Sequence, residues 1–244
     1  MEIAKAITRP FSALVVICVL LNIICPAQTS PSTEELVTKA DEYINALVRL
    51  NRFSGTVLVS RGGQVLLSKG YGLATEEQDT PNTPQTKFRL GSVSKQFNAM
   101  VILLLQERGK LSVQDSVCKY VPECPAAWQP VTIHQLLTHT SGIPSYTEFP
   151  DNDEYERKPM TISATIERFK NKLLEFKPGE RFHYSNSGYA LLGYIVERAS
   201  GKPYEEFLQE NIFEPLHMLN SGYDHPQTIL KTLPNVRQFG SQPK

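Results

Sequence analysis

The alternation of hydrophobic and polar residues predicts a helix followed by a β-hairpin in the first third of the chain. Ser32 and Glu35 have the spacing of a helix capping box, and apolar residues then recur at helical intervals up to about residue 50. A short apolar run at 56–59 is followed by a turn with two glycines at 61–64 and by a second apolar run at 65–67. This arrangement is typical of two antiparallel strands. A hairpin alone cannot bury a face, so it needs partners elsewhere.

Helices dominate the pattern after a loop rich in proline, threonine and glutamine at residues 75–86. Ser92 opens an apolar helix that runs to about Leu105, and Gly109 is a typical C-terminal stop. Shorter helices are predicted further along, at 132–137, 162–176, 186–199 and 204–213. The sequence therefore predicts an α+β fold in which the first hairpin is the only convincing strand pair.

The first 27 residues have the order of a secretory signal peptide. A basic stretch precedes a largely apolar run at 11–25, and Pro26 and Ala27 follow as a small-residue exit. Fifteen residues are short for a transmembrane helix, so we expect export, with 28–244 as the mature domain. A retained membrane anchor at 11–25 is the alternative. Lipid attachment at Cys25 is disfavoured, because an isoleucine precedes it where a small residue is expected.

Composition and charge exclude several classes of protein. The 244 residues are 41% hydrophobic and 20% charged, which excludes a collagen-like, disordered or multi-span membrane protein. Lysine and arginine number 25, and aspartate and glutamate also number 25, so the formal net charge is zero. A chain of this charge offers no basic surface for a phosphate backbone. We therefore expect no nucleic-acid partner.

Two cysteines, Cys118 and Cys124, lie beyond the predicted signal segment. In an exported protein such a pair predicts a small disulfide loop, because the compartment is oxidising. A zinc site would need further ligands, and the five histidines form no H-E-x-x-H or comparable array. No glycine-rich phosphate-binding motif is present either. The sequence therefore predicts neither a metal nor an organic cofactor.

Ser92 and Lys95 form the first motif with chemical meaning, in the run Phe-Arg-Leu-Gly-Ser-Val-Ser-Lys at 88–95. A serine at the first turn of a helix lies in the positive field of the helix N-terminus, and a lysine three residues later projects from the same face. Serine needs such a cation or base to become a nucleophile. The alternative is a plain N-cap serine beside a solvated lysine. The same spacing at 116–119 and 241–244 lacks both the glycine turn and the apolar helix.

Tyr184 and Asn186 form a second motif in a polar turn, Tyr-Ser-Asn. Two residues apart in a tight turn, they can point the same way. The phenol could move a proton and the amide could hold a peptide-like carbonyl. The alternative is a turn that merely caps the helix beginning near Asn186. Combined with the Ser-Lys pair earlier in the chain, the turn is far more specific than either motif alone.

With these motifs the chain resembles the β-lactamase-related serine hydrolases. This group includes class C β-lactamases, D-alanyl-D-alanine carboxypeptidases, penicillin-binding-protein relatives and some esterases. The resemblance covers about residues 36–225. Its motifs occur in order as Phe-Arg-Leu-Gly-Ser-Val-Ser-Lys (88–95), Leu-Leu-Thr-His-Thr-Ser-Gly-Ile-Pro (136–144), Pro-Gly (178–179) and Tyr-Ser-Asn (184–186). It implies an α+β fold of the β-lactamase/transpeptidase type, with an N-terminal helix, a β-hairpin and a helical region.

The resemblance also implies a role for each residue of the two motifs. Ser92 would be the nucleophile that forms an acyl-enzyme, and Lys95 its activating partner. Tyr184 would be the general base or proton relay, and Asn186 a contact to the substrate amide. The implied substrates are β-lactams, D-Ala-D-Ala-type peptides of peptidoglycan, or small esters. His139 and Thr140 are expected to fix a loop of the helical region rather than to do chemistry.

The family's third motif, Lys/His-Thr/Ser-Gly on a strand that lines the site, is not found in the sequence. The string at 231–233 has leucine in place of the glycine, and the string at 139–142 is interrupted and precedes the second motif. In the family that strand supplies one of the two N–H groups of the oxyanion hole. We therefore expect a chain that stops before the C-terminal strands of the sheet. Three interpretations stay open: an exported serine hydrolase, a penicillin- or peptidoglycan-binding module without turnover, and a fragment that does not fold alone.

Overall fold

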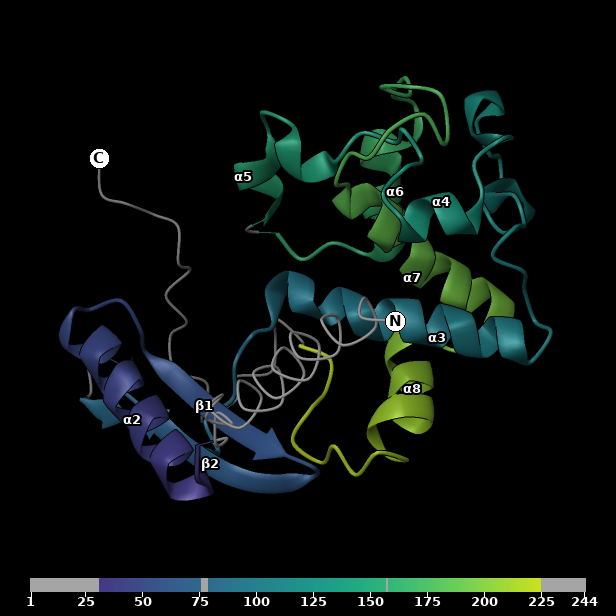
Figure 1. The fold of residues 1–244 in the computed structure, drawn as a ribbon. Coiled ribbons are helices and arrows are strands. Elements are labelled where there is room, and N and C mark those ends of the chain that lie inside the picture. The colour runs from purple at the N-terminus through teal and green to yellow at the C-terminus, as the bar shows by residue number, and fades with distance from the viewer. Residues whose placement is uncertain (1–30, 76–78, 157, 225–244) are drawn as a thin grey trace, which may run out of the picture. The chain divides into compact units, whose positions relative to one another are not determined.

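The structure is a computed structural model that describes residues 31–75, 79–156 and 158–224. The chain divides into two compact units between Thr86 and Lys87. The first unit combines a helix with short strands, and the second unit is helical (Figure 1). This mixture is the α+β composition that the sequence predicts.

Helix α2, Thr33–Arg49, and a β-hairpin form the first unit. Ser32 caps the helix, because its Oγ accepts a hydrogen bond from the Glu35 N–H at 3.1 Å. Strand β1, Gly55–Arg61, pairs antiparallel with strand β2, Gln64–Tyr71. Helix and hairpin both lie where the sequence predicts them.

Particular side chains fix the hairpin turn and its contact with α2. Gly62 and Gly63 have φ values of +56° and +79°, which side chains with a Cβ rarely adopt, so this tight turn requires both glycines. Asp41 of α2 accepts hydrogen bonds from Lys69 Nζ at 2.7 Å and from the Tyr71 hydroxyl at 2.6 Å. These two bonds tie the helix to strand β2.

A second strand pair, β3 (Leu73–Thr75) with β4 (Thr80–Pro81), corrects the prediction of a plain loop at 75–86. Strands of two or three residues have too few positions to show an alternating pattern, so they leave no signal in the sequence. Asn82 fastens this segment to the hairpin. Its buried side chain donates a hydrogen bond to the Tyr71 carbonyl at 2.9 Å.

Two long helices, α3 (Lys95–Glu107) and α7 (Asn186–Ser200), pack against each other in the second unit (Figure 1). Shorter helices complete the unit: α4 (Ile133–Leu137), α5 (Asn152–Glu156), α6 (Ile162–Lys170) and α8 (Tyr204–Leu208). Of these, α4, α6 and α8 contact α7. Short 3-10 turns lie at Val117–Lys119, Ala126–Trp128 and Tyr146–Glu148. The core is formed by buried residues at helical spacing, among them Val101, Ile102, Leu105, Leu191, Leu192, Ile195 and Val196.

The helix predicted at 162–176 is too long, since α6 ends at Lys170. The apolar residues that continue the helical spacing of Phe169 are Leu173 and Phe176, but both lie in a stretch of bends and loops, where Phe176 is buried and Leu173 is 87% exposed. Pro178 also disfavours a helical conformation for the residue before it. The apolar spacing in this stretch therefore does not correspond to a helix.

Two other helices differ from the prediction at one end. Ser92 lies in a 3-10 turn, Gly91–Ser94, that leads into α3, whereas the sequence predicted it in the first turn of the helix itself. The helix predicted at 204–213 changes after α8 into a π-helical turn, Gln209–Phe213. The hydrogen-bonding pattern changes within a continuous helical path, so the side-chain spacing gives no warning of it.

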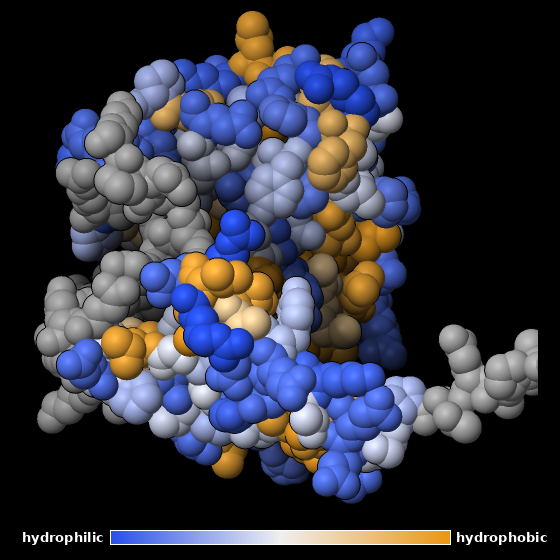
Figure 2. Space-filling model, turned by 60° about the vertical axis from the view of Figure 1, so that its left-hand side comes forward, coloured by the Kyte–Doolittle hydropathy of each residue, from blue (hydrophilic) through white to orange (hydrophobic). Residues whose placement is uncertain are grey.

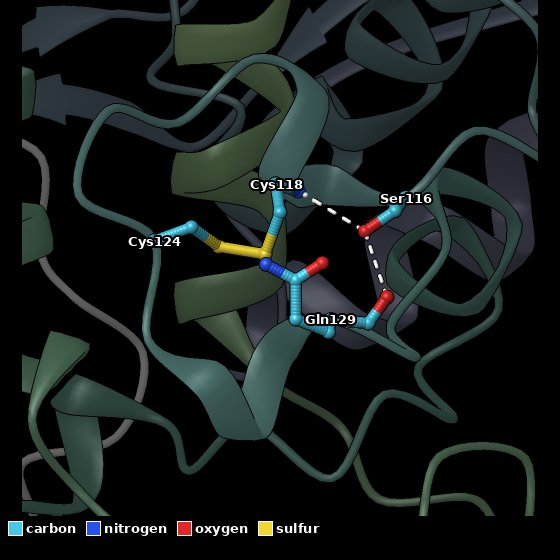
Figure 3. The surroundings of a disulfide bond; sticks show 4 residues. All are labelled: Ser116, Cys118, Cys124 and Gln129. Carbon is cyan, nitrogen blue, oxygen red and sulfur yellow. Dashed lines mark hydrogen bonds between the residues drawn. A yellow bond between two sulfur atoms is a disulfide. The ribbon is translucent and has the colours of Figure 1, made fainter.

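A disulfide joins Cys118 to Cys124 (Figure 3). Ser116 fixes the turn in front of it, because its Oγ donates to the Gln129 carbonyl at 2.8 Å and accepts from the Cys118 N–H at 3.2 Å. The disulfide therefore closes a loop whose base is already held by side-chain hydrogen bonds.

Several predictions concern residues outside the described ranges, namely the signal peptide at 1–27, the anchor at 11–25 and the string at 231–233. Among the residues that are described, no helix is long and apolar enough to cross a membrane. The same residues contain no group of three or more His, Cys, Asp or Glu that could hold a metal ion.

Hydrophobic side chains gather in exposed patches on the face shown in Figure 2.

Candidate active site

Ser92 lies at the point where a glycine turn brings the chain into helix α3. Gly91 has a φ of +52°, and the Ser94 hydroxyl closes the turn by donating to the Gly91 carbonyl at 2.6 Å. The exposed Ser92 Oγ accepts two hydrogen bonds, from Lys95 Nζ at 3.2 Å and from the Tyr184 hydroxyl at 2.5 Å. The structure thus brings together the three residues for which the sequence suggests catalytic roles.

The ammonium group of Lys95 is fixed between the serine and two tyrosine rings. Its Nζ donates to Asn186 Oδ1 at 2.7 Å as well as to Ser92 Oγ. It also lies 4.8 Å from the ring centroid of Tyr184 and 5.3 Å from that of Tyr189. A positive charge held in this place stabilises negative charge that develops on the serine oxygen or on the phenol.

Tyr184 is 37% exposed, so its hydroxyl lies within reach of a substrate from solvent. Burial alone raises the pKa of this phenol, but hydrogen bonds to Lys95 and Ser92 and the charge of Lys95 outweigh that effect. The pKa of Tyr184 therefore lies below its ordinary value of about 10. A lower pKa makes the phenolate, which can accept the Ser92 proton, more accessible.

Both ends of the Asn186 amide are engaged. Oδ1 accepts from Lys95 Nζ, and Nδ2 donates to Thr147 Oγ1 at 2.9 Å. An amide nitrogen carries two hydrogens, so the second can still serve the contact to a substrate amide that the resemblance implies. In the structure, the position of Asn186 also orients the lysine, which is a task the sequence did not suggest.

Two serine side chains fix the start of α7, and one of them attaches it to the loop that carries Thr147. Ser185 is the N-cap of α7, and its Oγ accepts from the Gly188 N–H at 3.3 Å. The buried Ser187 Oγ donates to the Pro144 carbonyl at 2.6 Å and accepts from the Tyr146 N–H at 2.9 Å. The turn with Tyr184 and Asn186 is therefore fixed from two directions.

Backbone hydrogen bonds also tie the chain before Tyr184 to the loop after α4. Three N–H groups donate to three carbonyls at 2.8 Å, in the pairs Glu175 to Gly142, Gly179 to Thr140 and His183 to His139. Gly142 has a φ of +76°, and a Cβ on it would lie 2.3 Å from the Phe176 carbonyl oxygen, so this position admits only glycine. The string at 139–142 is therefore a loop and not a strand that lines the site.

His139 is the residue that sequence reasoning undervalued. Its ring stacks on Tyr184 at 4.5 Å between centroids, and its Nδ1 accepts a hydrogen bond from the Ser185 N–H at 3.1 Å. The only signal in the sequence was its place in the Leu-Leu-Thr-His-Thr-Ser-Gly run. Its contacts extend the expected loop-fixing role to the motif that carries the phenol.

A family model described as Beta-lactamase matches residues 40–237 of the chain. The chain belongs to the β-lactamase family. One relative within this group, penicillin-binding protein 4* of Bacillus subtilis (strain 168), is 38% identical over 170 residues, which are 69% of the chain and 37% of that protein. The chain spans less than half the length of this protein and of the first curated relative that it matches, of which it covers 48%.

Solved structures share the fold of this β-lactamase-family chain. The penicillin-binding protein from Bacillus halodurans has a TM-score of 0.67 and 33% identity, over 75% of the chain and 58% of that protein. A class C β-lactamase in complex with cefoxitin has a TM-score of 0.70 and 28% identity, over 82% of the chain and 55% of that protein. These matches confirm the resemblance and the predicted β-lactamase/transpeptidase-like α+β fold.

Proposed function

We propose that the chain is an exported serine hydrolase that forms an acyl-enzyme on Ser92 with β-lactams, D-Ala-D-Ala-type peptides or small esters. The supporting observation is the pair of hydrogen bonds to Ser92 Oγ, from Lys95 Nζ at 3.2 Å and from the Tyr184 hydroxyl at 2.5 Å. A serine with a cation and a phenol as neighbours has both a charge that favours its deprotonation and a group that can receive its proton. Export rests on the signal-like segment at 11–25.

Acylation in this proposal begins with the loss of the Ser92 proton. The phenolate of Tyr184, stabilised by Lys95, accepts that proton while Ser92 Oγ attacks the substrate carbonyl carbon. With a β-lactam, the ring C–N bond breaks and the proton passes from Tyr184 to the leaving nitrogen. The opened β-lactam then stays attached as an ester of Ser92, with all of its atoms retained.

The alternative is a penicillin- or peptidoglycan-binding module that is acylated without efficient turnover. It applies if no other segment donates the second oxyanion N–H, because the 139–142 string forms a loop and not a strand that could do so. The loss of one oxyanion donor lowers the rate by about a hundred- to a thousandfold. In that case the ester on Ser92 would persist.

The intact mass of the purified protein after incubation with benzylpenicillin tests the proposal. We expect a mass gain equal to one whole penicillin, and no gain in a Ser92→Ala variant. An adduct that decays while free penicillin is consumed in excess of the protein indicates a hydrolase, whereas a persistent adduct indicates the binding module. The same adduct on both proteins would refute an acyl-enzyme on Ser92, and no adduct on a folded parent would refute acylation by β-lactams.

A further inference from the structure

We propose that neutral His139 is a positioning residue for Tyr184, whose ring and Nδ1 atom hold the Tyr-Ser-Asn turn where the phenol meets Ser92. The inference rests on the proposed function, because it assigns a part in the same acylation step. Protonation of His139 would release the turn, so the residue would also make acylation sensitive to pH.

The imidazole of His139 is packed among aromatic rings. Its centroid lies 4.5 Å from that of Tyr184 at an interplanar angle of 27°, and 5.0 Å from that of Tyr189 at 28°. Phe182 contacts it edge-on at 5.8 Å. Tyr184 is partly exposed, so few other contacts restrict its ring. The stacked imidazole of His139 therefore limits where the phenol ring can move.

The second contact is the hydrogen bond from the Ser185 N–H to His139 Nδ1 at 3.1 Å. A ring nitrogen that accepts a hydrogen bond carries no hydrogen, so this bond selects the neutral ring with its hydrogen on Nε2. Ser185 lies between the phenol and the amide of the motif. His139 is itself anchored, because its carbonyl accepts a hydrogen bond from the His183 N–H at 2.8 Å. Its backbone φ is +56°, in the left-handed region.

The surroundings of the ring favour its neutral form. Burial lowers the pKa of His139, and the positive charge of Lys95 on α3 lowers it further. The other titratable groups that face the ring or adjoin its carbonyl are Tyr184, Tyr189, His183 and the Glu175 carboxylate bound to His183. A protonated ring would bring a second cation near Lys95 and turn Nδ1 into a donor that faces the Ser185 N–H. The bond that holds the turn would then be lost.

Two variants separate the ring contact from the hydrogen bond. His139→Phe keeps an aromatic ring and removes the acceptor, but phenylalanine tolerates the φ of +56° less well, so its unfolding midpoint is compared with that of the parent. His139→Asn keeps an acceptor, tolerates a positive φ and does not titrate. The exposed His134 on α4 provides the matched control, His134→Asn. In the full chain, we expect the second-order rate constant for acylation by benzylpenicillin to fall about 10- to 100-fold in His139→Phe, because the phenol is misplaced. The fall should be smaller in His139→Asn and absent in the control.

A double variant shows whether His139 acts through Tyr184. Tyr184→Phe keeps the stacked ring and removes the phenol oxygen, so adding His139→Phe to it should lower the residual rate by less than about twofold. The decline of the rate at low pH should also be shallower in His139→Asn than in the parent. The proposal would be overturned by any one of three results. These are rate losses of His139→Phe and Tyr184→Phe that multiply in the double variant, an unchanged acylation rate in His139→Phe, and identical pH profiles of the parent and His139→Asn.

The ring nitrogens provide a measurement that is independent of acylation. Nitrogen-15 NMR of the histidine-labelled full chain should show His139 Nδ1 without a hydrogen at neutral pH, with the signal assigned by its loss in His139→Asn. A hydrogen on Nδ1 would overturn the proposal. If a folded parent is never acylated, the proposed function fails, and the protonation state of these nitrogens alone then decides whether His139 holds the turn as inferred.

Discussion

Replacement of Ser187 by alanine tests how firmly the loop beside the site is attached to α7. Ser187 is fully buried, and its Oγ donates to the Pro144 carbonyl at 2.6 Å and accepts from the Tyr146 N–H at 2.9 Å. Alanine at this position leaves both backbone groups without their partner. A buried polar group that loses its partner costs about 1–3 kcal/mol. Two such groups would cost about 2–6 kcal/mol, and since Tyr146 is only partly buried we expect the free energy of unfolding to fall by about 2–4 kcal/mol, the lower part of that range.

Urea unfolding, followed by circular dichroism and by fluorescence, measures this loss. With a slope of about 2 kcal/mol per molar urea, the midpoint should fall by about 1–2 M. Ser163→Ala is the matched control, because Ser163 is exposed on α6 and its replacement should change the free energy of unfolding by less than about 0.5 kcal/mol. Equal midpoints for the two variants would refute the reasoning, since water or a rearranged loop would then satisfy the freed groups.

Three further predictions concern the site and the stability of the second unit. Tyr184→Phe should lower the acylation rate about 10²- to 10⁴-fold with little change in the unfolding midpoint, and equal rates would contradict its role as base. Hydrogen bonds from Lys119 and Tyr120 hold the pKa of Asp115 at about 2, so its contribution to stability should be full above about pH 4 and disappear as the pH falls towards 2. Melting temperatures across that range should show a weaker acid dependence in Asp115→Asn than in the parent. Cys118→Ser should lower the free energy of unfolding by about 2 kcal/mol in urea titrations, because the disulfide closes only a short loop.

The local parts of the site could be predicted from the sequence, because their geometry is set by short-range spacing. Ser92 and Lys95 are three residues apart on a helical path, so their side chains meet whether the turn is α or 3-10. The shift of Ser92 out of the α-helix therefore left the pair intact. In contrast, the meeting of Tyr184 with Ser92 depends on how α3 packs against α7, and only the family resemblance anticipated it.

The features that sequence reasoning missed depend on contacts between distant segments. The role of His139 comes from a ring stack and a hydrogen bond to residues more than forty positions later, and no local pattern encodes such contacts. The end of α6 was misplaced for a related reason. Leu173 and Phe176 continue the helical spacing of Phe169, but contacts with a distant loop, such as the hydrogen bond from the Glu175 N–H to the Gly142 carbonyl, hold this stretch in a non-helical path.

The three backbone hydrogen bonds between 139–142 and 175–183 set limits on where this region can change length. An extra residue after Gly179 would put the His183 N–H out of register with its acceptor, the His139 carbonyl. It would also push Tyr184 away from Ser92. The turn around Leu173 lies before the first of these bonds, and its leucine is 87% exposed. Insertions and deletions should therefore be tolerated near Leu173 and excluded between Gly179 and Tyr184.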